Sequence, residues 1–457
     1  MSRSKPMPPS RREFLRCAAC AALGTAAITN TIWDLRLVRA ATASAAFTDY
    51  KALVCLFLFG GNDANNLIVP SSTTDYSAYA AARQNLAIPA ANLLGINPTI
   101  SDGRTYGLHP SCAGLQSLFN SGKLAFLCNV GTLVGPVTRA SWQNKTAALP
   151  PQLFSHNDQQ VQWQTSIPDQ PPRTGWGGRA ADMVYANNNS NVSMNISLAG
   201  TNIFEVGTAV TPYNVSTTGS VGLSGLSTAR LQAVKDLIAL PHDNLFEKSF
   251  GEITSTAIAN NTLLTSALAS APAIATVFPT TSLGNQLKMI ARLISAHGAL
   301  GHTRQIFFAS VGGYDTHGNQ LTAHANLLTE LSNSMKAFYD ATVELGLAQS
   351  VTTFTASDFG RTFPTNGTTA DSGSDHGWGN HQLIMGGAVQ GQRLYGTFPT
   401  LAVNGPDDTS TGRWIPTTSV DEFSATLARW FGVSNTDMPT VFPNLTRFAR
   451  PDLGFML

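Results

Sequence analysis

The chain has 457 residues but few charged side chains, and its charges nearly cancel. Only 12% of the residues are Asp, Glu, Lys or Arg, and the formal net charge is +1. A protein that binds nucleic acid usually carries a basic excess, so nucleic acid is not an expected partner. Asn, Ser, Thr and Gly are plentiful where Lys and Glu are sparse. This neutral polar composition fits an exported protein.

Cysteine is also scarce. Two of the five cysteines, Cys17 and Cys20, lie in the N-terminal segment described next, which leaves Cys55, Cys112 and Cys128. Three is an odd number, and their spacing is not that of a zinc finger. Cys55 lies within an apolar run and is predicted to be a buried thiol. The sequence does not decide whether Cys112 and Cys128 form a disulfide.

A hydrophobic segment long enough to span a membrane is missing from the N-terminal region. The sequence Ser10-Arg11-Arg12-Glu13-Phe14-Leu15-Arg16 leads into a short stretch, Cys17 to Ile28, made mostly of Ala. Small residues from Ala40 to Ala46 then offer cleavage sites. We predict that residues 1–45 are a twin-arginine signal peptide, which makes the twin-arginine export machinery a partner and the periplasm or the exterior the destination. A basic amphipathic helix is the alternative, and no permanent membrane span is expected.

After this leader, continuous apolar runs alternate with segments of helical periodicity. The runs predict strands buried on both faces of a parallel sheet, at residues 51–59, 123–130, 304–311 and 351–355. Helical spacing recurs at residues 231–269, 283–296, 327–347 and 420–431. The order strand, helix, strand over 304–355 fits a parallel crossover. We expect a single α/β domain over 46–457, with a cap-like insertion at about 187–280 in which residues 187–227 form loops and β-hairpins.

Acidic residues follow three of these strands where the chain must turn. Asp63 and Asp315 come after paired glycines, and Asp358 stands just before Gly360. The carboxyl ends of parallel strands are the edge where open α/β sheets bind ligands. His317 lies two residues beyond Asp315, so both side chains can point the same way from an extended backbone. For Asp63 the alternative is that it caps the next turn.

A dense cluster of ligand-type residues follows in the stretch 351–387. Asp375, His376 and His381 fall within seven residues and are separated by glycines. Two imidazoles together with carboxylates suit a divalent metal that prefers nitrogen and oxygen ligands. The alternative is a surface loop in which the histidines bond to backbone groups.

Two further residues are candidates for catalysis. Ser155 stands where a helix N-cap is expected, a position at which a hydroxyl either caps the helix or serves as an activated nucleophile. Arg179 follows Gly175-Trp176-Gly177-Gly178 at the start of another predicted helix. Its guanidinium could hold an oxyanion, and an ordinary ion pair is the alternative.

Taken in order, these motifs resemble an exported bacterial family known as domain of unknown function 1501, whose members commonly carry twin-arginine leaders. The resemblance covers nearly the whole mature chain. That family is grouped with the alkaline phosphatase and sulfatase superfamily, so the resemblance implies a doubly wound, mostly parallel sheet with helices on both faces. Active members of the superfamily hold two metal ions. The motifs are Gly60-Gly61-Asn62-Asp63, Ser155-His156, Gly175-Trp176-Gly177-Gly178-Arg179, Gly313-Tyr314-Asp315-Thr316-His317, Asp358-Phe359-Gly360-Arg361 and Asp375-His376-Gly377.

Carried over by motif, the resemblance assigns two ligand sets. Asp63 and Asp358 would hold one metal ion, and Asp315, His317 and a late histidine such as His381 would hold the other. These roles are implied by the superfamily pattern alone.

This chain departs from that pattern in two ways, and it also lacks the motif of one enzyme class in the superfamily. Phe359 stands where the superfamily has a histidine, so His376 must take its place or one metal is lost. The Asp315–His317 spacing is also shorter than usual. A Cys-x-Pro-x-Arg stretch is absent from the sequence, which argues against a formylglycine sulfatase and leaves Ser155 as the nucleophile candidate.

The sequence therefore favours an exported, metal-dependent hydrolase of phosphate or sulfate esters, acting on a small molecule or a polymer. Zinc is the expected ion, with manganese, magnesium and calcium as alternatives. The first competing hypothesis is a catalytically silent periplasmic binding protein on the same fold. The second is a surface-interaction protein that uses the Asn/Thr-rich segment 187–227.

Overall fold

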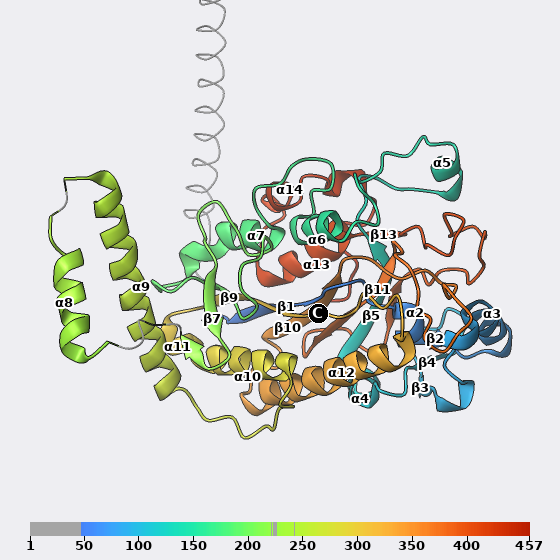
Figure 1. Cartoon of the computed structure of the whole chain (residues 1–457), viewed down its shortest axis with the longest axis horizontal. Coiled ribbons are helices and arrows are strands. Elements are labelled where there is room, and N and C mark those ends of the chain that lie inside the picture. The colour runs from blue at the N-terminus through green and yellow to red at the C-terminus, as the bar shows by residue number, and fades with distance from the viewer. Residues whose placement is uncertain (1–46, 221, 223–225, 242) are drawn as a thin grey trace, which may run out of the picture. The chain divides into compact units, whose positions relative to one another are not determined.

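The structure, a computed structural model, describes residues 47–457 except 221, 223–225 and 242. Phe47–Leu457 form one compact unit. Within the described residues, a ten-stranded sheet runs in the order β12-β5-β11-β10-β1-β9-β6-β7-β8, with β13 beside β5 (Figure 1). Its strands are β1 Lys51–Leu58, β5 Leu124–Gly131, β6 Asn195–Ser197, β7 Tyr213–Ser216, β8 Gly219–Ser220, β9 Arg304–Val311, β10 Val351–Ser357, β11 Asn380–Gly386, β12 Leu394–Gly396 and β13 Thr418–Ser419.

The centre of this sheet is parallel. Strand β1 pairs in parallel with β9 on one side and with β10 on the other. Strand β11 is antiparallel to both β10 and β5. A second, antiparallel sheet contains β2 Ile68–Pro70, β3 Leu94–Ile96 and β4 Tyr106–Leu108. The carboxyl ends of β1, β9 and β10 therefore meet at one edge, where they deliver the acidic residues predicted to lie there.

Helices cover both faces of the main sheet (Figure 1). On one face lie α4 Ala113–Asn120, α10 Ser282–Ser295 and α12 Gln320–Glu344, and on the other α6 His156–Thr165, α7 Trp176–Val184 and α13 Val420–Phe431. The expected doubly wound α/β architecture is confirmed. The other α-helices described are α2 Ala64–Leu67, α3 Thr73–Arg83, α5 Arg139–Gln143, α8 Thr228–Ile238, α9 Leu245–Ser270, α11 His297–Leu300 and α14 Met438–Val441.

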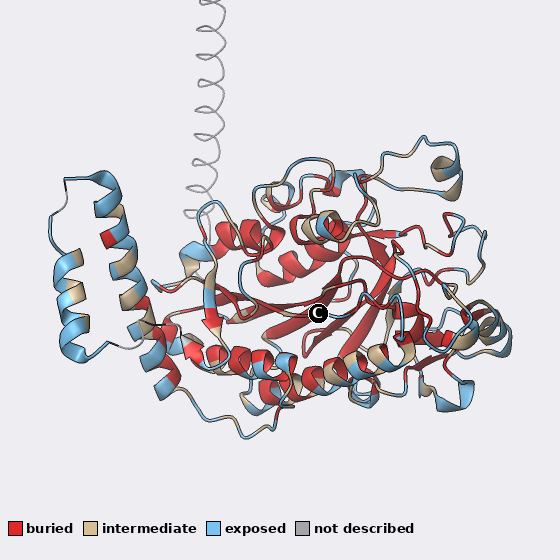
Figure 2. Ribbon diagram, in the orientation of Figure 1, coloured by how far each residue is buried: buried red, intermediate tan, exposed pale blue. Residues whose placement is uncertain are grey.

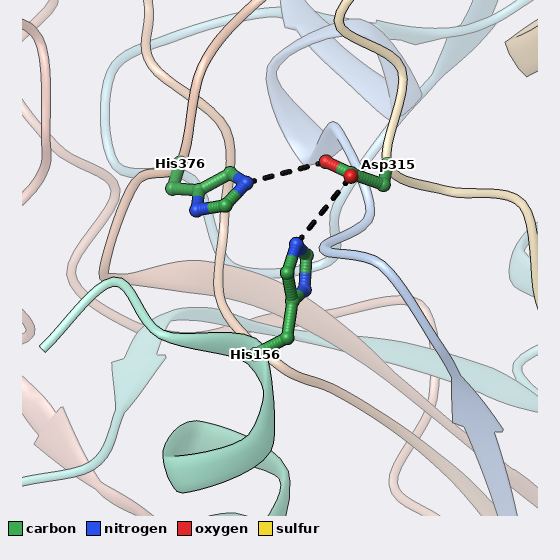
Figure 3. Close-up of side chains that lie close together, drawn as sticks. All are labelled: His156, Asp315 and His376. Atoms are coloured by element: carbon green, nitrogen blue, oxygen red, sulfur yellow. Dashed lines mark hydrogen bonds and ion pairs between the residues drawn. The ribbon is translucent and has the colours of Figure 1, made fainter. Parts of the chain in front are cut away.

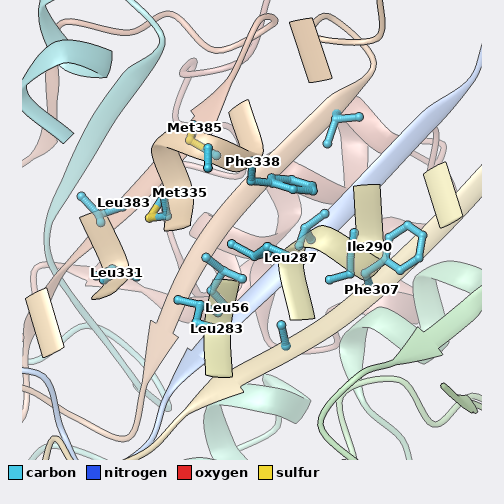
Figure 4. Close-up of a cluster of buried hydrophobic side chains, with 14 of the residues drawn as sticks. Leu56, Leu283, Leu287, Ile290, Phe307, Leu331, Met335, Phe338, Leu383 and Met385 are labelled. Carbon is cyan, nitrogen blue, oxygen red and sulfur yellow. The ribbon is translucent and has the colours of Figure 1, made fainter. Parts of the chain in front are cut away.

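The core lies between the sheet and the helices, as the buried interior in Figure 2 shows. Leu56 of β1 and Phe307 of β9 belong to the same buried cluster as Leu287 of α10 and Phe338 of α12 (Figure 4). On the opposite face, Trp176 of α7 contacts a phenylalanine of β10. Burying a large apolar side chain contributes roughly 1.5–3 kcal/mol relative to leaving it exposed. The sheet is thus stabilised from both sides, and its loop ends are left free to carry polar groups.

The predicted strands are present, but the helices differ from prediction in two places. The stretch 231–269 is divided into α8 and α9, and the helix predicted over 327–347 begins earlier, at Gln320. Strand β9 covers the predicted range 304–311, and α13 covers 420–431. The segment 187–280, expected to be a cap-like insertion, contributes β6 and β7 to the edge of the main sheet, the β7–β8 hairpin, and the helices α8 and α9.

The predictions about the cysteines and about a membrane span can be compared with the described residues. Cys55 is a buried thiol, as predicted, and Cys112 and Cys128 are also buried and free of any disulfide. Across the described part of the chain, every helix is too short or too polar to cross a bilayer. The predicted signal peptide, residues 1–45, lies outside the described residues.

Candidate functional site

Three segments that are far apart in the sequence bring Asp315, His156 and His376 together (Figure 3). Asp315 follows β9, His156 is the first residue of α6, and His376 lies between β10 and β11. His156 Nε2 is 3.5 Å from Asp315 Oδ2, and His376 Nε2 is 3.3 Å from Asp315 Oδ1. One nitrogen or oxygen atom from each residue lies within 4.8 Å of the other two, so the three side chains form a candidate metal-binding group.

The backbone around Asp315 is positioned by the turn after β1. Gly60 has φ +115°, and a Cβ atom there would lie 2.3 Å from the backbone nitrogen of Asp315. Only a glycine permits both the left-handed conformation and this close approach. Phe59 then accepts a backbone hydrogen bond from Tyr314 at 3.1 Å, which extends the β1–β9 pairing to the site.

The carboxylate of Asp315 is fixed by a buried arginine. Arg361 Nη1 donates to Asp315 Oδ1 at 2.7 Å and also to the Gly60 carbonyl. Burial opposes ionisation of Asp315, but its hydrogen bond and attraction to Arg361 outweigh burial, so the pKa of Asp315 lies below its ordinary value. Asp315 is therefore an anion at neutral pH, and it is available as a ligand.

His376 is held on a short antiparallel connection to the end of β10. The backbones of Arg361 and His376 form a β-bridge. On either side, Thr362 N donates to the Asp375 carbonyl at 2.8 Å, and Gly377 N donates to the Gly360 carbonyl at 2.7 Å. The His376 backbone is therefore held by its pairing with the segment that follows β10.

The hydrogen bonds of the two imidazoles fix which nitrogen is protonated. His376 Nδ1 lies 2.7 Å from the Phe154 carbonyl oxygen, which can only accept, so Nδ1 carries the proton. His156 Nδ1 lies 2.7 Å from Asp358 Oδ2, a carboxylate that also accepts from Gln160 at 2.9 Å. In both rings the other nitrogen, Nε2, consequently faces Asp315. A second group that orients a ligand histidine in this way is typical of metal sites.

His317 adds a third imidazole with the same arrangement. Its Nδ1 lies 3.1 Å from Asp375 Oδ1, while its Nε2 lies 3.0 Å from Asp315 Oδ1 and 3.0 Å from His376 Nε2. Asn366 also donates to Asp375 Oδ1, at 3.3 Å. The Asp375–His317 pair therefore directs another Nε2 atom toward Asp315.

These contacts place several electron-pair donors around one point. Burial is the main cause that lowers the pKa of His376, so this ring is neutral at neutral pH. His317 Nε2 and His376 Nε2 are 3.0 Å apart, and two nitrogen lone pairs at this distance repel unless positive charge lies between them. A proton shared by the two rings or a bound divalent metal ion supplies that charge. The donor set of imidazole nitrogen and carboxylate oxygen fits zinc, and fits it better than magnesium or calcium, which prefer oxygen ligands alone.

Phe359, the departure from the superfamily pattern, forms one wall of this site. Its buried ring lies 4.9 Å from the His156 ring and 4.6 Å from the His376 ring, measured between centroids. Space for the phenyl ring is provided by Gly61, where a Cβ would lie 2.6 Å from the ring. The phenylalanine thus supports both imidazoles and excludes water from behind them.

Two predicted ligands lie apart from the three imidazoles. Asp63 is fully buried and bound to Arg83 and Gln320. His381 is buried in β11, where its Nδ1 accepts from the Asn129 backbone nitrogen at 3.0 Å. The structure brings together Asp315, His317, Asp375 and His376 from the predicted set, and places Asp358 behind His156.

The two predicted catalytic residues make other contacts. Ser155 is the N-cap residue of α6, but its hydroxyl donates to Asp158 at 2.6 Å rather than accepting from the helix. Arg179 is buried, and its three guanidinium nitrogens donate to backbone carbonyls of Thr165, Thr174 and Val441. A catalytic role for either residue stays a prediction.

Sequence reasoning did not assign His156, Arg361 or Arg413. Arg413 donates to the His376 carbonyl at 2.7 Å, and its guanidinium carbon lies 4.2 Å from the centre of the Phe154 ring. For His156 a signal was present, since it follows Ser155 at the start of a helix. The positions of Arg361 and Arg413 depend on loop backbone that no periodicity describes.

Comparison with protein families identifies one match. The family described as "Protein of unknown function (DUF1501)" matches residues 50–440. None of the curated protein sequences matches the chain.

Several solved structures are similar to this chain at low identity. Ps i-CgsB in complex with a neocarrahexaose has a TM-score of 0.35 and 8% identity, covering 88% of this chain and 78% of that one. The PsFucS1 sulfatase from Pseudoalteromonas sp. has a TM-score of 0.34 and 11% identity, covering 88% and 72%. The lipoteichoic acid synthase LtaP from Listeria monocytogenes has a TM-score of 0.33 and 8% identity, covering 88% and 78%.

Proposed function

The chain belongs to the DUF1501 family of proteins of unknown function, and from that premise we propose that it is an exported, metal-dependent hydrolase of phosphate or sulfate esters. The observation that carries the proposal is the convergence of imidazole Nε2 atoms on the Asp315 carboxylate. The Nδ1 atoms of His156, His317 and His376 are each bonded to a separate acceptor. Asp358, Asp375 and the Phe154 carbonyl are these acceptors, and together they fix the orientation of the three rings. Such preorganisation suits a bound cation.

His156, His376 and Asp315 would hold the ion, with His317 as a further ligand. Zinc suits this donor set best, with manganese, magnesium and calcium as alternatives. A divalent ion at such a site polarises an ester oxygen and lowers the pKa of a bound water. Asp358 and Asp375 would orient the ligand histidines His156 and His317. Phe359, which packs against the His156 ring, would exclude water.

The ester class rests on two supports. The family is grouped with the alkaline phosphatase and sulfatase superfamily, whose active members hydrolyse such esters. In addition, the half-buried guanidinium of Arg413 lies beside His376, where a cation favours an anionic substrate. The natural substrate would be a small molecule or a polymer that carries phosphate or sulfate ester groups.

The proposal is tested first by metal content. Protein purified from its native compartment should contain a divalent metal by elemental analysis, and His156→Ala or His376→Ala should each lose most of it. His381→Ala is the matched control, because His381 is a buried histidine outside the site. The parent should hydrolyse aryl phosphate or aryl sulfate esters, and the two metal-deficient variants should not. Full metal occupancy in both variants would reject the site.

A second candidate function is a catalytically silent binding protein on the same fold. Two observations favour it: the Asp63 carboxylate is occupied by Arg83, and the Ser155 hydroxyl donates to Asp158. If Ser155 is the nucleophile, Ser155→Ala abolishes turnover and leaves metal content unchanged. A protein that holds the metal, hydrolyses neither ester class and is indifferent to Ser155→Ala would be the binding protein.

A further inference from the structure

A pocket opens at the amino edge of the main sheet, where α9 passes beside β7 (Figure 1). Its walls are the segment before β6, the segment before β7 and one side of α9. It has a volume of about 300 Å³, which is at the lower end of the range for pockets that hold small molecules. The pocket is therefore large enough for one small ligand, and the proposed hydrolysis does not use it.

The lining of this pocket is polar but uncharged. Nine of its fourteen described lining residues are Asn, Ser, Thr or Tyr, and the other five are apolar. Phosphate, sulfate and carboxylate groups are usually recognised by Arg or Lys, and none of the described lining residues is either. The pocket therefore suits a neutral ligand that carries hydrogen-bonding groups.

Asn260 of α9 is the residue that points most directly to a ligand. It is 8% exposed, and its side-chain amide makes no hydrogen bond to any described residue. Leu264 and Ala267 lie four and seven positions further along, on the same buried face of the helix. Asn260 thus occupies a position of the apolar stripe, although burying an amide without partners is unfavourable. Because Asn260 also lines the pocket, a polar ligand bound there would supply the missing partners.

Two tyrosines add aromatic surface to these polar groups. Tyr185 is 38% exposed and Tyr213 is half-buried, and neither hydroxyl makes a hydrogen bond to a described residue. An aromatic side chain with a polar tip suits a ligand that has both apolar and polar surface. A pyranose ring is such a ligand, because its C–H groups form an apolar face. Its hydroxyl groups both donate and accept, and an Asn amide can match them in both roles.

Other polar side chains hold the sheet side of the pocket in shape. Asn188 accepts hydrogen bonds from the backbone nitrogens of Thr303 and Arg304, at 2.8 and 3.0 Å. Ser193 donates to the Thr211 carbonyl. These bonds connect the segment before β6 to the start of β9 and to the segment before β7. This side of the pocket is consequently preorganised, which lowers the cost of ordering it when a ligand binds.

The pocket and the metal-site residues lie at opposite ends of the central strands. Strands β6, β7 and β9 are parallel to one another. The pocket lies where β6 and β7 begin, whereas Asp315 follows the last residue of β9. Because β9 has eight residues, it is roughly 25 Å long. One sugar unit in the pocket therefore cannot contact the metal site.

We propose that this pocket binds one neutral sugar unit of a glycan, whose apolar face packs on the Tyr185 ring and whose hydroxyl groups exchange hydrogen bonds with the Asn260 amide. The inference is independent of the proposed hydrolase activity, because the metal-site residues lie outside the pocket. Binding would attach the protein to a polysaccharide.

Isothermal titration calorimetry with neutral hexasaccharides tests the proposal. The panel consists of maltohexaose, cellohexaose, laminarihexaose and the N-acetylated chitohexaose, and at least one should bind with a Kd of about 1 mM or tighter. Tyr185→Ala and Asn260→Leu should each weaken that binding by about tenfold or more. Both variants should fold, since Tyr185 is exposed and a leucine suits the apolar stripe of α9. Tyr339→Ala is the matched control, because Tyr339 is a half-buried tyrosine of α12 outside the pocket, and it should bind like the parent.

Two further conditions separate this pocket from the metal site. Binding should be unchanged after treatment with a chelator. It should also be unchanged between low and high salt, because neither the pocket nor the ligand is charged. Loss of binding on chelation would assign the sugar to the metal site and overturn the proposal. A parent that binds none of the four hexasaccharides, or a folded Tyr185→Ala or Asn260→Leu variant that binds as tightly as the parent, would overturn it as well.

Discussion

The backbone carbonyl of Phe154 accepts the Nδ1 proton of His376 at 2.7 Å, and this bond joins the loop before α6 to the loop before β11. Phe154 adopts φ +73°, a left-handed conformation that costs a non-glycine residue about 1–3 kcal/mol. Arg413 contacts both partners, since it stacks on the Phe154 ring and donates to the His376 carbonyl. One arginine thus holds a strained carbonyl and the imidazole it orients.

Replacing Arg413 should therefore weaken metal binding without removing any ligand. We expect Arg413→Ala to lower zinc affinity by roughly tenfold, the lower end of the effect of disturbing groups that orient metal ligands. The measurement is a competition titration against a chromophoric chelator. Arg104→Ala is the control, because Arg104 also stacks on a phenylalanine ring, at 5.7 Å from Phe398, but lies outside the site. Equal zinc affinities for parent and Arg413→Ala would show that His376 needs no such support.

Asp358 should have a larger effect, because its carboxylate orients His156 from directly behind. We expect Asp358→Asn to lower metal affinity by about 10–100-fold, while the variant stays folded. The matched control is Asp158→Asn. Asp158 lies in α6 with His156, and its carboxylate accepts a hydrogen bond from Ser155 rather than from an imidazole. The same competition titration compares the two. If both variants bind metal as tightly as the parent, the His156 ring does not depend on Asp358.

Much of the fold was predictable because its signals are local in the sequence. The apolar runs that became β1, β5, β9 and β10 are buried on both faces, and their burial follows from composition alone. The short strands β6 and β7 lie in a segment rich in Asn, Ser and Thr, where no such signal exists, and pairing with β9 is what makes them strands.

The site was predictable only in part, for a different physical reason. Asp315 and His317 could be selected because they follow glycines at a strand end, and His376 because it lies in a cluster of ligand-type residues separated by glycines. Whether a side chain reaches the site, however, depends on partners far away in the sequence. Asp63 pairs with Arg83 of α3, and no sequence pattern near Asp63 predicts that contact. No sequence pattern predicts the left-handed backbone conformation of Phe154 either.

The Asp63–Arg83 pair leads to a prediction about stability. Both side chains are fully buried, so Asp63→Asn leaves a guanidinium without its counter-ion. Breaking a buried pair on one side costs roughly 3–5 kcal/mol of unfolding free energy. Urea denaturation should show this loss, while the folded variant keeps its full metal content. A variant of normal stability that lacks metal would return Asp63 to the ligand role suggested by the superfamily pattern.

Export is predicted to depend on the paired arginines of the leader. The twin-arginine pathway reads the pair as an address, so changing Arg11 and Arg12 together to Lys should leave precursor in the cytoplasm. Cell fractionation followed by immunoblotting measures the distribution. The matched control changes Arg16 to Lys, which keeps the pair intact and should leave export unchanged. Normal periplasmic accumulation of the double variant would contradict the assignment of residues 1–45.

The histidine buried in β11 should make the fold sensitive to acid. Burial is the dominant cause that lowers the pKa of His381 to about 3, against a smaller opposing attraction from Asp63. Between pH 6.5 and about 3, the unfolded chain therefore binds a proton at this residue and the folded chain does not. Stability rises with pH wherever the unfolded state binds more protons, so the free energy of unfolding falls as the pH is lowered through this window.

The size of the effect follows from the same linkage. One pH unit corresponds to about 1.4 kcal/mol for a group that titrates only when unfolded, so His381 alone removes about 2 kcal/mol between pH 6.5 and pH 5.0. His381→Gln retains an acceptor for the Asn129 backbone nitrogen but does not titrate. His109, His302 and His324, whose pKa values burial lowers to about 4, are present in both proteins, so their effects cancel in the comparison. Urea denaturation at the two pH values should show a loss for the variant that is smaller than the parent's by about 2 kcal/mol. Equal losses would contradict the prediction. They would show that His381, although buried in β11, takes up a proton in the folded protein over this pH range.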